Sequence, residues 1–183
     1  MEKHYFVALD VPEPSSQLIY HWVCQNKWQW SFASYVHPSD YHLTLAFLGS
    51  AEKSTLAKLS TVLKKVCEQH GSFTLQLAEA GTFGRTGFPR ILWIGVKENH
   101  ELKRLRDSVY EVCKQLKFSL DERPFKPHIT VARKWKADSP FSIQKTDNAV
   151  FHNESISVRS VTLFQTNFKQ IPKYEAIQQY SLH

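Results

Sequence analysis

The sequence predicts an α+β fold with two pseudo-symmetric lobes, each an antiparallel-rich sheet with outer helices, and a cleft between the lobes. Strand-like apolar stretches are interspersed with three stretches of helical periodicity. The segments HLTLAFLG (42–49) and HITVAR (128–133) share one pattern and start 128 − 42 = 86 residues apart, nearly half of the 183-residue chain. No linker rich in Gly, Pro or Ser divides the chain, so residues 1–183 are expected to form one domain.

The elements follow from periodicity and from the residues that interrupt it. Apolar residues at helical spacing predict three helices, at 15–30, 52–70 and 100–117, and Asn99 is a candidate N-cap for the third. Strands are expected at 4–12, 41–49, 72–81, 90–98, 125–135, 155–165 and 173–182. The segment GTFGRTGFPR (81–90) is expected to be a loop, because it is rich in Gly and Arg.

Composition limits the compartment and the partners. No apolar run approaches the ~20 residues of a membrane span, and the first residues, MEKHYFVALDVP, are too polar for a secretory signal, so a cytoplasmic protein without a membrane partner is expected. The three cysteines form no CxxC pair and are expected to be reduced, Cys67 and Cys113 being buried. A net charge of +6 and a pI near 9.2 favour polyanionic ligands. Nothing in the composition calls for an obligate protein partner.

The repeated motif places an imidazole and a hydroxyl on one strand face. Since side chains alternate along a strand, His42 and Thr44 share a face with Ala46, and His128 and Thr130 share a face with Ala132. The alanines are expected to leave room for a ligand. The same alternation places Phe47 behind this face and Arg133 on the face opposite His128, unless the strand bulges.

Two His-Thr pairs fit one kind of chemistry better than the others. Zinc needs three or four His, Cys or carboxylate ligands, and no HExxH or paired carboxylate accompanies the motifs, so no metal is expected. A Ser-His-Asp triad needs a single base. Two histidines on one substrate suit general acid–base catalysis, and two hydroxyls can donate hydrogen bonds to non-bridging oxygens. A phosphodiester, with an entering and a leaving oxygen on opposite sides, matches this arrangement.

The motifs HLTLAFLG and RPFKPHITVAR resemble those of the two-histidine phosphoesterase superfamily, and in particular the RNA 2′,3′-cyclic phosphodiesterases, also called 2′–5′ RNA ligases. The resemblance implies metal- and cofactor-independent hydrolysis of cyclic phosphate ends of RNA to 2′-phosphates, with ATP-independent 2′–5′ ligation as the reverse reaction. It implies that His42 is the proton donor to the leaving 3′ oxygen and that His128 is the base that activates water. Thr44, Thr130 and Arg133 are implied to bind the phosphate.

Other interpretations stay open. The substrate could instead be a cyclic nucleotide, a 2′–5′ oligonucleotide or a cyclic-phosphate metabolite, or the chain could be a non-catalytic RNA-binding module. Tyr41 and Trp135 flank the motifs and are candidates for stacking on a base, whereas Trp93 is expected in the core. Arg85 and Arg90 are expected in a solvated basic loop that could contact RNA.

Overall fold

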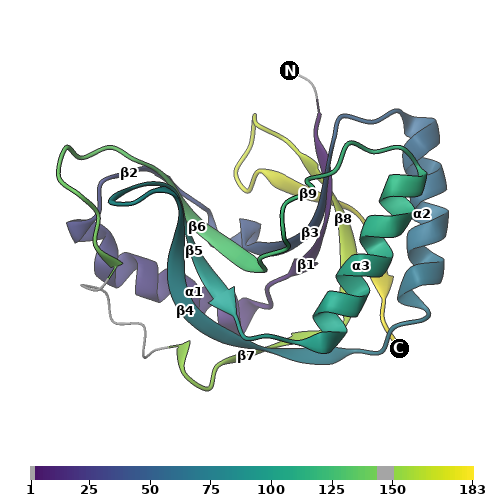
Figure 1. Cartoon of the computed structure of the whole chain (residues 1–183), viewed down its shortest axis with the longest axis horizontal. Helices are drawn as coiled ribbons and strands as arrows, with labels where there is room; N and C mark the ends of the chain where they lie inside the picture. Colours follow the sequence, from purple (N-terminus) through teal and green to yellow (C-terminus); the bar gives the residue numbers. More distant parts are fainter. Residues whose placement is uncertain (1–2, 144–150) are drawn as a thin grey trace.

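The computed structural model describes residues 3–143 and 151–183 and confirms the α+β class. The described strands form one antiparallel sheet in the order β7-β4-β5-β6-β3-β1-β8-β9, and β2 also pairs with β6 (Figure 1). The strands are β1 (Tyr5–Asp10), β2 (Phe32–Tyr35), β3 (His42–Gly49), β4 (Phe73–Arg85), β5 (Phe88–Val96), β6 (His128–Trp135), β7 (Ser155–Val158), β8 (Ser160–Thr166) and β9 (Tyr174–Ser181). The α-helices are α1 (Glu13–Asn26), α2 (Lys53–Cys67) and α3 (His100–Gln115), and the short 3-10 turns are η1 (Lys27–Gln29) and η2 (Pro38–Asp40).

The sheet has its shortest strand pairing where the two motif strands meet. β3 and β6 are joined through a single register pair, Leu43 with Ile129, whereas β4–β5 and β1–β3 pair along most of their lengths. The two expected lobes are therefore the two halves of one continuous sheet. One half contains β1, β3, β8 and β9, and the other contains β2 and β4–β7.

The helices are not distributed as the sequence order suggests. The expected helices 52–70 and 100–117 pack against each other as α2 and α3, on the half of the sheet that contains β3 and β9 (Figure 1). α1 contacts the other half, because the Trp22 ring packs against Phe151, just before β7, with ring centroids 5.2 Å apart. The expected strand 155–165 is likewise two strands, since β7 pairs with β4 and β8 pairs with β1.

The expected loop 81–90 is wrong, because most of it lies in the β4–β5 hairpin. Gly81 sits under the ring of Trp93, where an added Cβ would lie 2.3 Å from ring carbons, so the glycine makes room for the indole. Gly84 has φ +114° at a register shift and forms a bulge inside the strand. These glycines allow close packing and bending within the hairpin, and the turn is confined to Thr86 and Gly87.

The main core lies between the sheet and its helices. Cys67 and Cys113 are buried there as expected, and burial raises the pKa of their thiols to about 11 and about 12.

Tyr41 is only 4% exposed, which leaves no ring face for a base, so its predicted stacking role is wrong. None of the described helices is both long and apolar enough to cross a membrane.

Candidate active site

The two motifs meet at the shortest strand pairing of the sheet. His42 begins β3 and His128 begins β6, and the antiparallel strands are paired at Leu43 and Ile129. Counting this register one residue in each direction places His42 opposite Thr130 and Thr44 opposite His128. All four side chains are half-buried, and we call this group the His–Thr face.

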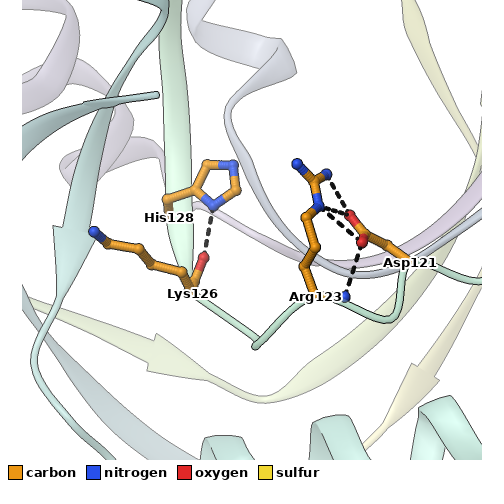
Figure 2. A network of polar contacts seen from close by, with 4 residues as sticks. All are labelled: Asp121, Arg123, Lys126 and His128. Carbon is orange, nitrogen blue, oxygen red and sulfur yellow. Dashed lines mark hydrogen bonds and ion pairs between the residues drawn. The ribbon is translucent and has the colours of Figure 1, made fainter. Parts of the chain in front are cut away.

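The two imidazoles are held in the same way. His42 Nδ1 lies 2.7 Å from the backbone oxygen of Asp40, and His128 Nδ1 lies 2.7 Å from that of Lys126 (Figure 2). A carbonyl oxygen only accepts, so each Nδ1 carries the proton and donates it. In both rings Nε2 is therefore the atom free to accept a proton or, once protonated, to give one.

A bulge in each motif strand changes which residues join the His–Thr face. The register skips Leu45 in β3, so that Phe6 lies opposite Phe47, and it skips Val131 in β6, so that Ile91 lies opposite Arg133. Phe47 and Arg133 consequently share the face of the histidines, which corrects the opposite placement that strict alternation predicts.

The alanines of the motifs also differ from expectation. Ala46 lies opposite Val7 and Ala132 opposite Leu92, and both alanines are buried on the core side of the sheet. They sit at the bulges and leave no space beside the histidines, so the prediction that they make room for a ligand is wrong.

Aromatic side chains surround each histidine, and sequence reasoning did not identify them. His42 packs on Phe6 and Tyr174, with ring centroids 4.8 and 5.0 Å away, and His128 packs edge-on to Phe83 at 4.8 Å. These rings belong to β1, β9 and β4, so only the strand order brings them to the motifs.

The surroundings of both imidazoles favour the neutral form in the free protein. Burial is the main cause, and it lowers the pKa of His42 to about 4 and lowers that of His128 as well. The positive charge of Arg133 lowers the pKa of both histidines further. Within the described residues no ion pair links Arg133 to a carboxylate, so its charge is available to an anion between the two rings.

Arg133→Met should raise the pKa of both His42 and His128, because a positive charge close to an imidazole disfavours its protonated form. Burial remains in the variant, so both pKa values should stay below about 6.5. An NMR titration of the histidine ring signals measures the change, with Lys136→Met as a matched control, since exposed Lys136 contributes to neither shift. Unchanged or lower values in Arg133→Met would show that Arg133 does not act on the two rings.

Two carboxylates organise the segments next to the site. Buried Asp40 accepts hydrogen bonds from the backbone N–H groups of Lys173 and Tyr174 at 2.8 and 2.9 Å, which holds Tyr174 against His42. Asp121 accepts from the backbone, Nε and an Nη of Arg123, and this arginine lowers the pKa of Asp121 to about 2. Figure 2 shows the Arg123 guanidinium on the opposite side of His128 from the Lys126 ammonium.

The remaining sequence candidates lie outside the site. Trp135 packs on Phe32, and its indole donates to the backbone oxygen of Ser139 at 2.9 Å, so it is a structural residue. Arg85 is exposed near the hairpin turn, with its guanidinium 4.2 Å from the centre of the Phe88 ring. No group of three His, Cys, Asp or Glu residues in 3–143 and 151–183 is arranged to hold a metal ion.

Comparison with known proteins gives a consistent picture. A sequence model of the 2′-5′ RNA ligase superfamily matches residues 24–167. The RNA 2′,3′-cyclic phosphodiesterase of Bacillus subtilis is 33% identical over 98% of this chain and 96% of its own length. A protein of the same name from Geobacillus stearothermophilus is 41% identical over 98% of this chain, which spans only 57% of that longer protein.

Solved structures agree in fold over the whole chain. The crystal structure of E. coli LigT complexed with 3′-AMP has a TM-score of 0.79 and 25% identity, and the match covers 100% of this chain and 99% of that one. TT0787 of Thermus thermophilus, 22% identical with a TM-score of 0.76 over 98% of this chain and 97% of its own, shares the fold.

Proposed function

Since the chain belongs to the 2′–5′ RNA ligase superfamily, we propose that it hydrolyses 2′,3′-cyclic phosphate ends of RNA to 2′-phosphomonoesters. The observation that carries this proposal is the equivalent placement of His42 and His128. Each holds its Nδ1 proton on a backbone oxygen, leaves Nε2 free and faces the threonine of the other motif. A phosphate between the rings would meet one imidazole at the entering oxygen and one at the leaving oxygen.

We propose that His128 is the base and His42 the acid. Nε2 of His128 takes a proton from water, whose oxygen attacks phosphorus in line with the 3′ oxygen. The bond from phosphorus to the 3′ oxygen breaks, and His42 Nε2–H protonates that oxygen. Thr44, Thr130 and Arg133 donate hydrogen bonds to the non-bridging oxygens, where negative charge develops.

The low pKa of His42 makes this assignment depend on the substrate. In the free protein His42 is neutral above about pH 4, and Arg133 contributes to this. A bound phosphodiester carries a negative charge that offsets the Arg133 charge and favours imidazolium. We therefore propose that substrate binding raises the pKa of His42, so that His42 becomes protonated and can act as the acid.

The wider assignments belong to the same proposal. The protein acts as a single domain over residues 1–183, with RNA or a nucleotide bearing a cyclic phosphate as its partner. We also propose a cytoplasmic location, since the three cysteines are free, as is usual in a reducing compartment. A cyclic nucleotide, a 2′–5′ oligonucleotide or a cyclic-phosphate metabolite is the alternative substrate, and RNA binding without turnover is the alternative function.

A short RNA with a 2′,3′-cyclic end should be converted to a product 18 Da heavier that resists a 3′-specific phosphatase, because the phosphate stays on the 2′ oxygen. Turnover should persist in EDTA, since the proposed groups are imidazoles and hydroxyls. Mass spectrometry follows the reaction. Binding without turnover would favour the non-catalytic module, and loss of turnover in EDTA that a divalent ion restores would contradict the two-histidine mechanism.

A further inference from the structure

A groove of about 700 Å³ lies next to His128 and outside the His–Thr face. Its lining includes Gly95, which is the backbone partner of His128, and Lys126, whose carbonyl holds the His128 ring. Lys97, His152 and Asn153 are exposed on its lining. This volume is within the usual range for a small-molecule site.

Small residues lie in the wall of the groove next to His128, and Gly95 makes room for the Trp93 ring. Gly95 presents no side chain beside His128, and Ala78 and Ala80 line the neighbouring stretch of β4. Trp93 also lines it, 8% exposed, with an indole N–H that is buried and has no acceptor among the described residues. Trp93 is therefore a packed part of the groove wall, with Gly81 under its ring and the Lys126 ammonium near it, and the groups left to contact a ligand are the exposed polar side chains.

The charges beside the groove favour an anion. Lys97 and Lys126 are exposed on its lining, opposed by one acidic residue, Glu79. The Lys126 ammonium lies 4.8 Å from the centre of the Trp93 ring, on the side of His128 away from Arg123 (Figure 2). A phosphate of an RNA chain fits these two cations beside the His–Thr face.

The surroundings of His42 are different. His42 is enclosed by Phe6, Phe164 and Tyr174, which form a small apolar cluster. The two histidines are therefore held alike, but an apolar cluster surrounds His42 whereas a groove with exposed lysines lies next to His128. In an in-line reaction with His42 at the 3′ oxygen, the ribose of the cyclic phosphate belongs to the His42 side, and whatever is attached to the entering oxygen extends on the His128 side.

We propose that the groove beside His128 binds the RNA end whose 5′-hydroxyl takes the place of water, and so is the acceptor site for 2′–5′ ligation. This rests on the proposed function. His128 Nε2 takes the proton of the 5′-hydroxyl, and a bond forms from the 5′ oxygen to phosphorus. The bond to the 3′ oxygen breaks, and His42 protonates that oxygen. The cyclic ester itself supplies the activated bond, so no further reactant is needed.

Lys97→Glu tests the site without touching the His–Thr face. Ligation of an RNA with a cyclic end to a 5′-hydroxyl RNA, measured at subsaturating acceptor, should fall on the order of tenfold, the worth of one charged contact. Hydrolysis of a mononucleotide 2′,3′-cyclic phosphate should not change. Lys58→Glu makes the same charge change on the exposed side of α2 and should leave both rates unchanged.

A second variant tests space instead of charge. His152→Trp fills the exposed end of the groove and should lower ligation, and also the cleavage of 2′–5′-linked RNA, which is the same step in reverse. Unchanged hydrolysis of the mononucleotide confirms that the variant is folded.

The outcomes separate this proposal from the proposed function. Equal losses of hydrolysis and ligation in Lys97→Glu would mean that the groove holds the cyclic-phosphate nucleoside itself, which overturns the acceptor site. A wild-type protein that hydrolyses cyclic ends but neither ligates nor cleaves 2′–5′ linkages also overturns it. A wild-type protein inactive on every cyclic phosphate instead refutes the proposed function.

Discussion

Alanine in place of His42 should lower kcat/KM on RNA with a cyclic end by about 10²–10⁴-fold, and an activated aryl phosphodiester should recover part of this loss. A good leaving group departs without a proton, so it removes the need for an acid. His128→Ala should lose a similar factor, but the aryl substrate should not rescue it, because the attacking water still needs a base. Steady-state kinetics on both substrates measures the difference.

The control for these variants is a histidine without a role in the site. His21 is exposed on α1, and His21→Ala should keep wild-type rates on both substrates. Rescue of His128→Ala instead of His42→Ala would reverse the assigned roles. Full activity of both variants on RNA would mean that the repeated motif is not the acid–base pair.

The sequence was sufficient for the four central residues because a strand repeats its side-chain direction every two residues. That rule holds from His42 to Thr44 and from His128 to Thr130. It fails at the next step, since each strand gains one residue against its neighbour, at Leu45 and at Val131. The alanine after each bulge was a visible signal, but alternation alone made it look like space for a ligand.

The aromatic surroundings could not be predicted for a different reason. Phe6, Phe83 and Tyr174 reach the histidines only because β1 lies beside β3, β5 separates β4 from β6, and Asp40 holds the start of β9. Strand order is a long-range property that single-sequence periodicity does not contain. The pKa shifts of both histidines depend on this burial, so they too become visible only in the folded structure.

The two motifs are nearly the same, but the residue that each strand adds to the His–Thr face after its bulge is different. After its bulge, β3 presents Phe47, which is 52% exposed, whereas β6 presents Arg133 at the equivalent position. A cation on one strand and an apolar ring on the other break the symmetry of the His-Thr pairs. Arg133 can bind a phosphate oxygen, and Phe47 offers an uncharged surface next to it.

The threonines should carry the second large effect. Thr44→Val and Thr130→Val each keep the shape of the side chain and remove one hydroxyl donor, and each should lower kcat on the order of 10²–10³-fold, the usual cost of losing one donor to a developing negative charge. Register places the two hydroxyls beside opposite histidines, so both should matter, and neither loss should change the fold.

The split between kcat and KM decides what the hydroxyls do. If they stabilise the transition state, kcat falls while KM for a cyclic mononucleotide changes little, since the charge on the non-bridging oxygens increases only as the entering oxygen bonds to phosphorus. Thr61→Val, on the exposed side of α2, is the matched control and should keep both constants. A rise in KM at constant kcat would make the threonines ground-state anchors of the phosphate. If a variant that combines Thr44→Val and Thr130→Val keeps the wild-type kcat and KM, the two hydroxyls do not contact the phosphate. Arg133 would then be the remaining phosphate ligand proposed for this face.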